Sequence, residues 1–212
     1  TARPSDGFRQ PSYAQGVEGE IAVLFADLRG FTALSERKLP YDVVFILNQY
    51  FRSMGGAIEG AGGRLDKFIG DGVMALFGVG SEARHGCRSA LEAARRMSLA
   101  LSEMNETLAA DLEEPLRMGI GIHVGTVIIG EMGYEKVSSL TAIGDAVNTA
   151  SRLEGLSKDY GAQLVFSAGV ADKAGIDVSG FARRDAEVRG RTEPLSVFVV
   201  EDAARLPALV DA

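Results

Sequence analysis

The stretch RLDKFIGDGVMALFG, residues 64–78, decides the fold. Two apolar runs flank the turn-forming residues Gly70–Gly72, and this arrangement predicts a β-hairpin. Residues 41–59, before the hairpin, have apolar side chains at helical spacing. Residues 82–110, after it, are rich in Ala, Leu, Arg and Glu, which are good helix formers. We therefore expect a long helix on each side of the hairpin.

Strands are predicted outside these helices. The apolar run EIAVLFA, residues 20–26, is typical of a buried strand, and residues 117–129 form a longer one. The resulting order β-α-β-β-α-β is that of a ferredoxin-like unit. We expect an α+β fold, a ferredoxin-like βαββαβ core with a mainly antiparallel sheet. A smaller C-terminal α/β portion follows: a strand (136–143), a helix (146–160), a strand (163–167), a helical turn (168–174) and a strand pair (181–188, 196–201).

Length and composition limit the possible functions. The 212 residues suffice for one large domain, and 46% hydrophobic with 24% charged residues is ordinary for a globular chain. The net charge of −7 makes a nucleic-acid binder unlikely, and no apolar run reaches the length of a membrane span. One cysteine fits a reducing, cytoplasmic setting. We expect a linker at 1–19, a catalytic domain at 20–202 and a tail at 203–212. A start at Thr1 suggests a fragment lacking an upstream regulatory domain, so the full protein could be membrane-tethered.

Asp27 and Asp71 are the first candidates for chemistry. Asp27 follows the first strand, and Asp71 lies in the hairpin turn 44 residues later. In a ferredoxin-like sheet the first and third strands are antiparallel neighbours, so these two carboxylates should meet. Two close carboxylates repel each other unless a cation lies between them, and a divalent ion is the usual solution. Each aspartate alone could equally be a cap or a turn residue.

Gly30, Phe31 and Thr32 follow Asp27 and lead into a predicted helix, with Thr32 as its N-cap. The start of a helix is a ready phosphate site, although an ordinary turn is the alternative. Next to metal-binding aspartates, it favours a nucleoside triphosphate with Mg²⁺ or Mn²⁺. The chain contains no GxxxxGK[ST] loop, and GIGIHVG lacks the dinucleotide-binding glycine spacing.

Further polar residues allow two interpretations each. Lys67 on its strand, sharing a face with Leu65 and Ile69, could be a solvated edge lysine or a hydrogen-bond donor in an apolar slot. Asn148 and Arg152 are four residues apart and share a helix face, either as a site or as ordinary surface. Arg189 and Arg191 form a basic spot suited to phosphate, but such spots are also common on surfaces.

Four ordered segments together carry a resemblance to a known family. They are FADLRGFT, LDKFIGDGVMALFG, TAIGDAVNTASRLE and VRGRTEP, between residues 25 and 194. The chain, from about residue 20 to 201, resembles the class III nucleotidyl cyclases, and most of all a bacterial adenylate cyclase. That family works as a head-to-tail dimer with active sites at the interface.

The resemblance implies a role for each candidate residue. Asp27 and Asp71 correspond to the ligands of two metal ions, and Gly30–Thr32 to a phosphate site. Lys67 and Thr141 correspond to the residues that read the base. Asn148 would orient the ribose, Arg152 would stabilise the transition state, and Arg189 would contact the triphosphate. The stretch 130–139 resembles the arm that grips the partner.

The implied activity is conversion of ATP to 3′,5′-cyclic AMP and pyrophosphate by a homodimer with two metal ions, Mg²⁺ or Mn²⁺, per site. The alternatives are a guanylate cyclase, or a degenerate cyclase domain that only binds nucleotide or dimerises. Many adenylate cyclases have Asp where this chain has Thr141, and threonine resembles a subgroup with bicarbonate-responsive members. Arg189 stands where the family often has Lys. A diguanylate cyclase is disfavoured because the hairpin lacks GG[DE]EF.

Overall fold

The computed structural model describes residues 13–209, which form an α+β fold around one eight-stranded sheet. The strand order is β2-β3-β1-β4-β6-β8-β7, and β5 pairs with β4 outside this path. Only the β4–β6 pair is parallel. The strands are β1 (Val17–Arg29), β2 (Arg64–Ile69), β3 (Gly72–Phe77), β4 (Arg117–Met132), β5 (Ser139–Ile143), β6 (Leu164–Ser167), β7 (Ala182–Ala186) and β8 (Leu195–Val200). The predicted α+β class and ferredoxin-like start are confirmed.

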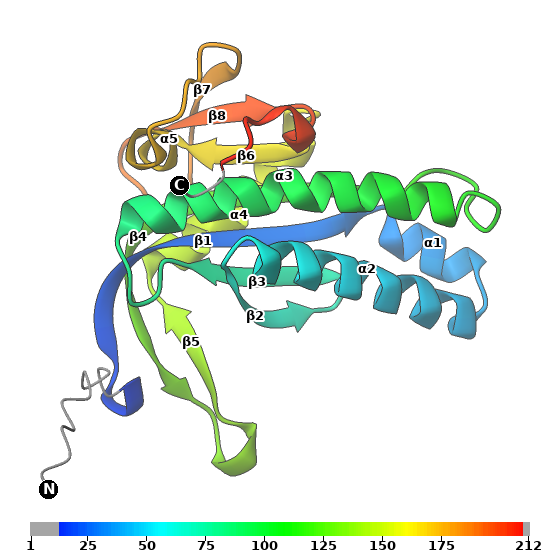
Figure 1. Cartoon of the computed structure of the whole chain (residues 1–212), viewed down its shortest axis with the longest axis horizontal. Helices are drawn as coiled ribbons and strands as arrows, with labels where there is room; N and C mark the ends of the chain where they lie inside the picture. Colours follow the sequence, from blue (N-terminus) through cyan, green and yellow to red (C-terminus); the bar gives the residue numbers. More distant parts are fainter. Residues whose placement is uncertain (1–12, 210–212) are drawn as a thin grey trace, which may run out of the picture.

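Helices cover both faces of the sheet (Figure 1). The two long helices pack against each other and, with α5, cover one face, while α4 lies on the other. The helices are α1 (Phe31–Arg37), α2 (Pro40–Gly60), α3 (Ala83–Thr107), α4 (Asp145–Asp159) and α5 (Ala168–Ala174), with 3-10 turns at η1 (Tyr13–Gln15), η2 (Glu135–Val137) and η3 (Ala203–Arg205).

The alternation of side chains along β1 produces these two layers. Ala22 and Leu24 join the core cluster under α2 and α3, whereas Ile21 and Val23 join the cluster under α4. Successive side chains of a strand point to opposite faces, and all four are buried. A strand buried on both faces reads as a continuous apolar run, which explains EIAVLFA. Asp27 continues the odd-numbered series and therefore lies on the α4 face.

Several boundaries differ from the predictions. β1 begins at Val17, three residues before the predicted start, because residues 17–19 pair with β4. β4 continues to Met132, and its partner β5 begins only at Ser139 because η2 occupies 135–137. The linker predicted for 1–19 therefore includes a turn and the start of a strand at 13–19. Its first twelve residues lie outside the described part of the chain.

The β4–β5 hairpin projects from the body of the molecule (Figure 1). Its register runs from Ile128 opposite Ile143 to Met132 opposite Ser139. Near its tip, Tyr134 is 76% exposed and Val137 is 82% exposed. This projection contains the stretch 130–139 that the sequence singled out as an arm.

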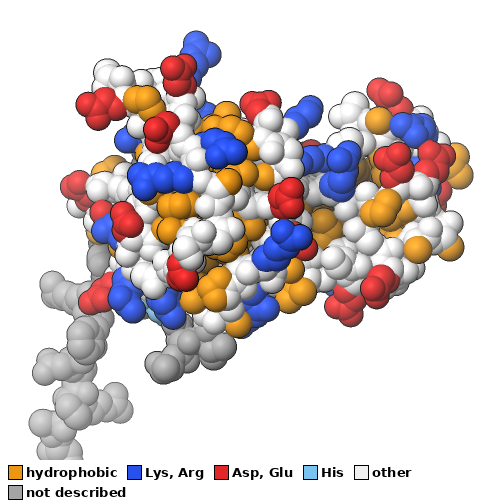
Figure 2. All heavy atoms as spheres, turned by 90° about the horizontal axis from the view of Figure 1, so that it is seen from above, with side chains coloured by type: hydrophobic (Ala, Val, Ile, Leu, Met, Phe, Trp, Pro, Cys, Tyr) orange, Lys and Arg blue, Asp and Glu red, His pale blue; other side chains and the backbone are white. Residues whose placement is uncertain are grey.

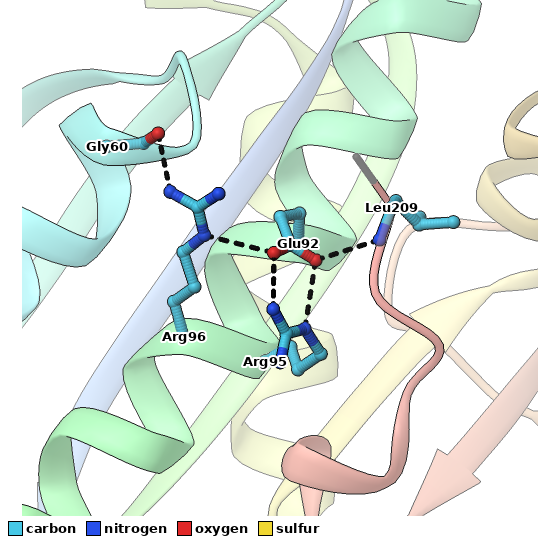
Figure 3. Close-up of polar contacts among 5 residues, drawn as sticks. All are labelled: Gly60, Glu92, Arg95, Arg96 and Leu209. Atoms are coloured by element: carbon cyan, nitrogen blue, oxygen red, sulfur yellow. Dashed lines mark hydrogen bonds and ion pairs between the residues drawn. The ribbon is translucent and has the colours of Figure 1, made fainter. Parts of the chain in front are cut away.

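Glu92, on α3, connects three parts of the fold (Figure 3). Its side chain is only 3% exposed, and it accepts hydrogen bonds from Arg95, Arg96 and the backbone N–H of Leu209. Arg96 also donates to the carbonyl of Gly60 at the end of α2. The pKa of Glu92 is lowered to about 2, chiefly by the Arg95 hydrogen bond. The carboxylate therefore ties α2 and the C-terminal segment to α3.

The surface carries charges of both signs. On the face seen from above, Lys and Arg side chains alternate with Asp and Glu over the whole view (Figure 2). Among the helices of residues 13–209, none combines the length and the apolar character needed to cross a membrane.

Candidate active site

Asp27 and Asp71 lie side by side at one end of the sheet. β1 and β3 are antiparallel with Ala26 opposite Val73, so the residues just beyond this pair are neighbours. A Cβ added to Gly72 would be 3.9 Å from the Cβ of Asp27. Asp71 occupies a two-residue turn with Gly70, whose φ of 60° suits glycine. The meeting of the two aspartates, predicted from topology, is confirmed.

A third acid, Glu154 of α4, joins this pair. The pKa of Glu154 is raised to about 9, chiefly by burial and in addition by a hydrogen bond with Asp27 and by the charge of Asp27. The two carboxyl groups are therefore in contact, and the environment of Glu154 favours its protonated form. Burial also raises the pKa of Asp71, and the charge of Asp27 adds to this, although backbone N–H groups at Asp71 and Leu28 oppose the shift. The three carboxyl groups therefore carry more negative charge than the neighbouring hydrogen-bond donors and cations can neutralise.

This excess of acid fits a divalent cation. Within residues 13–209, no group of three or more His, Cys, Asp or Glu side chains is arranged to hold a metal ion by itself. Two carboxylates nevertheless suffice for Mg²⁺, which proteins bind through one or two carboxylates together with substrate phosphates. Asp27 and Asp71 have the right oxygen donors for this mode of binding.

Glycines of β4 bring α4 close enough for Glu154 to reach Asp27. A Cβ on Gly121 would lie 2.2 Å from the backbone N of Glu154 and 2.5 Å from the carbonyl oxygen of Ala150. A Cβ on Gly119 would lie 2.4 Å from the hydroxyl of Ser157. No side chain fits at these positions. The glycines of GIGIHVG thus allow backbone contact between helix and strand.

Arg29, at the end of β1, fixes the other side of this contact. Its guanidinium donates to the hydroxyl of Ser157 at 2.7 Å and to the carbonyl oxygen of Ala162. Burial lowers the pKa of Arg29, and the nearby Glu154 opposes that shift. Arg29 therefore fastens the end of α4 to the strand that carries Asp27.

Gly30 and its neighbours begin α1 as predicted, but the cap is different. Gly30 is the N-cap with a φ of 70°, and Thr32 is the second residue of the helix, not its cap. The left-handed φ explains the glycine. Phe31 packs against the main core, and Thr32 is exposed. A pocket of about 190 Å³ beside α1 is lined by Gly30, Arg37 and Arg117, among others, but not by either aspartate.

Lys67 and Thr141 come together around a residue that the sequence analysis did not single out. The hydroxyl of Thr141 donates to Oδ2 of Asp66 at 2.9 Å, and Nζ of Lys67 lies 3.5 Å from the same oxygen. The Asp66 side chain is completely buried, and the Lys67 side chain is 46% exposed. The two predicted base readers therefore contact the same oxygen of one carboxylate.

A β-bulge at Asp66 corrects one expectation about Lys67. Leu65 pairs with Ala75 but Lys67 pairs with Met74, so one extra residue lies in β2. Ala75 belongs to the core under α2 and α3, and Met74 to the core under α4. Lys67 consequently lies on the opposite face from Leu65, and the prediction that they share a face is wrong. Bulges re-aim side chains in this way.

Asn148, Arg152 and Arg189 form a second cluster along the first half of α4. Arg152 donates to the backbone carbonyl of Arg189, while Asn148 and the Arg189 side chain are exposed. Arg191 pairs with Asp145 at 3.9 Å. The structure thus groups these predicted residues with one another.

The second cluster lies on the other side of α4 from the aspartates. Glu154 faces Asp27, and Arg152, two residues earlier, points to the opposite side of the helix. Asn148, four residues before Arg152, is exposed. One chain therefore presents two groups of candidate residues on different sides of α4.

Asp66 and Glu154 are the site residues that sequence reasoning missed. Both lie inside the motifs, directly before Lys67 and two residues after Arg152. A helical periodicity count would have placed Glu154 on the buried face with Ala150. No local signal marks the bulge that buries Asp66.

Three features described above belong together: two acids at adjacent strand ends, a helix packed directly on strand glycines, and a projecting hairpin. Together they define a nucleotidyl cyclase catalytic domain. The sequence pattern of the adenylate and guanylate cyclase catalytic domain matches residues 13–201. The chain belongs to this family, the class III nucleotidyl cyclases.

Individual relatives support the same family assignment. The chain is 38% identical over 188 residues to an adenylate cyclase of Anabaena cylindrica, covering 85% of this chain and 36% of that protein. The crystal structure of the guanylyl cyclase Cya2 is similar with a TM-score of 0.78 and 34% identity, over 87% of this chain and 93% of that one. That of the adenylyl cyclase CyaB from P. aeruginosa has a TM-score of 0.77 and 28% identity, over 90% and 97%. The chain spans about a third of the length of the Anabaena relative.

Proposed function

We propose that the chain is the catalytic domain of an adenylate cyclase, which converts ATP to 3′,5′-cyclic AMP and pyrophosphate. The observation that carries the proposal is the meeting of Asp27 and Asp71 at adjacent strand ends. Their shared excess of negative charge suits a divalent ion bound to a triphosphate. Names of relatives add support, since the Anabaena protein is called an adenylate cyclase.

In the proposed reaction the ribose 3′-oxygen attacks the α-phosphorus, the bond to the pyrophosphate oxygen breaks, and the hydroxyl proton is lost. Asp27 and Asp71 would hold two divalent ions, Mg²⁺ or Mn²⁺. When bound, these ions would lower the pKa of the 3′-hydroxyl and neutralise charge on the phosphates. Glu154, through its hydrogen bond with Asp27, fixes the orientation of that carboxylate.

The remaining residues bind and orient the nucleotide. Asn148 is exposed and free to position the ribose, and Arg152 stabilises charge on the transferring phosphate. Arg189, together with the backbone at Gly30–Thr32, contacts the triphosphate. The hydrogen bond from Arg152 to the Arg189 carbonyl holds the loop at 188–191 beside the helix.

The active unit is proposed to be a homodimer with shared sites. Within one chain Glu154 of α4 faces Asp27, whereas Arg152 points to the opposite side of that helix, so Asn148 and Arg152 do not face the aspartates of their own chain. A second copy, placed head to tail, would bring its Asn148 and Arg152 to the aspartates of the first. Exposed apolar side chains at the hairpin tip, just before α2 and on its first turns suit such an interface: Tyr134, Val137, Leu39, Tyr41 and Val44.

A guanylate cyclase is the second candidate, because the similar structure of Cya2 is titled a guanylyl cyclase. Lys67 favours adenine, since guanine readers of this family tend to have an acidic residue at that position. The experiment is to incubate the purified chain with ATP or GTP, each with Mg²⁺ or Mn²⁺, and to identify the cyclic product. We expect cyclic AMP from ATP. Cyclic GMP as the main product would support the second candidate, and no product with either nucleotide would support a degenerate domain.

Regulation is proposed to lie partly outside this domain, in a regulatory domain upstream, and the site is proposed to face the cytoplasm. Thr141 also motivates a test of bicarbonate. Adding bicarbonate at constant pH to the same assay should raise the rate of cyclic AMP formation. An unchanged rate would remove bicarbonate from the proposal.

A further inference from the structure

Asp66 lies on β2, a strand at the edge of the sheet whose residues are otherwise mostly exposed. Its side chain is nevertheless completely buried. Oδ2 lies between the Thr141 hydroxyl at 2.9 Å and the Lys67 ammonium at 3.5 Å. Oδ1 is buried and has no hydrogen-bond partner among residues 13–209. Burying a carboxylate with one oxygen unpaired is costly, and acids on edge strands normally face water. The arrangement therefore calls for a functional reason.

The direction of the Thr141–Asp66 hydrogen bond supplies that reason. A threonine hydroxyl has one hydrogen to donate and two lone pairs to accept with, whereas a carboxylate can only accept. Thr141 must therefore be the donor to Asp66, and its single hydrogen is used inside the protein. Only lone pairs remain on Oγ1 for a ligand.

We propose that Asp66 is a positioning residue that makes Thr141 a pure hydrogen-bond acceptor and thereby selects adenine over guanine. The inference rests on the proposed function, in which Lys67 and Thr141 read the base. Adenine carries an amino donor at position 6, and guanine carries a carbonyl acceptor there. A Thr141 hydroxyl that can only accept therefore pairs with the amino group of adenine and repels the carbonyl group of guanine.

The bulge makes this arrangement possible. It inserts Asp66 as an extra residue and turns Lys67 to the face opposite Leu65. Phe68, the next residue, stacks on Phe51 of α2 with ring centroids 4.0 Å apart, which fixes the strand after the bulge. Asp66 is thus held in contact with both base readers, and its side chain is itself completely buried.

A purely structural role for Asp66 is the competing explanation. If the carboxylate only stabilised the bulge, its replacement would weaken the binding of adenine and guanine nucleotides equally. The two explanations therefore differ in the ratio of the two affinities, which general destabilisation does not change.

The experiment measures that ratio with 3′-deoxy-ATP and 3′-deoxy-GTP, which lack the attacking hydroxyl and cannot be cyclised. Asp66→Asn introduces an amide N–H that can donate to Thr141 and free its hydroxyl hydrogen for a guanine carbonyl. By calorimetry with Mn²⁺ present, the wild-type chain should prefer 3′-deoxy-ATP. Asp66→Asn should reduce the ratio of the dissociation constants about tenfold, the effect of roughly one hydrogen bond.

Two controls complete the test. Asp185→Asn makes the same chemical change at an exposed position of β7 and should leave the ratio unaltered. In a Thr141→Val background, which lacks the hydroxyl, Asp66→Asn should no longer change the ratio. If Asp66→Asn does not fold, as judged by circular dichroism, Asp66→Ser offers a hydroxyl that can also donate to Thr141 and takes its place.

An equal loss of affinity for both probes, or an unchanged ratio, would overturn the inference. So would a ratio shift that persists without the Thr141 hydroxyl. Formation of cyclic AMP by the wild-type chain is measured separately. A chain that prefers 3′-deoxy-ATP but forms no cyclic product would contradict the proposed function and still support the role of Asp66.

Discussion

Asp71 shows at the level of one residue how turn geometry and charge are combined. It stands in a two-residue turn beside Gly70, where Asp and Asn are equally suitable. The same turn places it against Asp27, and burial with this like charge raises its pKa. In the absence of a cation the charge of Asp71 therefore reduces the stability of the fold, because ionisation is less favourable in the folded state than in the unfolded chain.

Asp71→Asn should consequently separate stability from activity. We expect a melting temperature equal to or slightly above that of the wild type without metal, and a loss of cyclase activity of about a hundredfold or more. Mn²⁺ should raise the melting temperature of the wild type but not of the variant. Thermal denaturation with and without Mn²⁺, together with a cyclic AMP assay, checks all three. Activity near that of Asp185→Asn would contradict the metal assignment.

At the level of elements, the closest packing lies between α4 and β4. Gly121 has room for no side chain, since a Cβ there would approach two backbone atoms of α4 within 2.5 Å. The helix that carries Asn148 and Arg152 is therefore positioned by glycines on the neighbouring strand. A shift of α4 of about 1 Å would displace Asn148 and Arg152 together.

Gly121→Ala should lower the free energy of unfolding by about 1–3 kcal/mol, because the added methyl group forces the helix away from the strand. It should also reduce cyclase activity more than the loss of stability alone explains. The matched control is Gly56→Ala on α2, where nothing lies within 4 Å of the added Cβ. That variant should be more stable by about 0.5–1 kcal/mol. Urea denaturation measures both, and equal effects would refute the packing argument.

The Glu92 cluster gives a pH-dependent prediction for the α2–α3 packing. Its pKa is lowered to about 2, chiefly by the hydrogen bond from Arg95, against about 4.5 for the unperturbed group. The stabilisation is therefore fully present above about pH 4.5 and is lost as the pH falls through about 2. The shift corresponds to about 3 kcal/mol at neutral pH.

Glu92→Gln should thus be less stable than the wild type by about 2–3 kcal/mol at pH 7, and the difference should shrink towards pH 3. Denaturant titrations across this range measure it. Glu103→Gln, an exposed acid on the same helix, should show a small difference at every pH. A Glu92→Gln difference that does not vary with pH would mean that packing, and not charge, is responsible.

At the scale of the whole molecule, shared sites predict complementation between inactive variants. Asp27→Ala and Asn148→Ala should each be nearly inactive. Random mixing makes half of the dimers hybrid, and each hybrid has one site with both lesions and one intact site. About a quarter of wild-type activity should therefore return.

The measurement is cyclic AMP formation by the mixture and by each variant alone, after subunit exchange has been shown with differently tagged chains. Circular dichroism of each variant controls for folding. Complete exchange without recovery of activity would require a site contained in one chain.

The sequence predicted most of this architecture because its signals are local or follow from topology. Apolar runs marked the strands, the Gly70–Gly72 turn marked the hairpin, and antiparallel order alone brought Asp27 to Asp71. The burial of Asp66 could not be predicted, because a bulge depends on the pairing register of β2 and β3 and not on the local sequence. Glu154 was missed for a related reason, because its partner Asp27 is 127 residues away and becomes close only through the glycines of β4.

Strand β1 begins beside the projecting hairpin, with Val17 opposite Ile129, and ends beyond Asp27, at Arg29. All thirteen of its residues are paired with β4. A slip of one residue would turn every buried side chain of the strand to the wrong layer, so β1 cannot slide along its neighbour. A mechanical input at residues 13–17 can therefore reach the acidic end only by tilting or twisting β1 and β4 together. Such a movement shifts the β4–β5 hairpin at the same time, so the position of the hairpin and the geometry at Asp27 must change together.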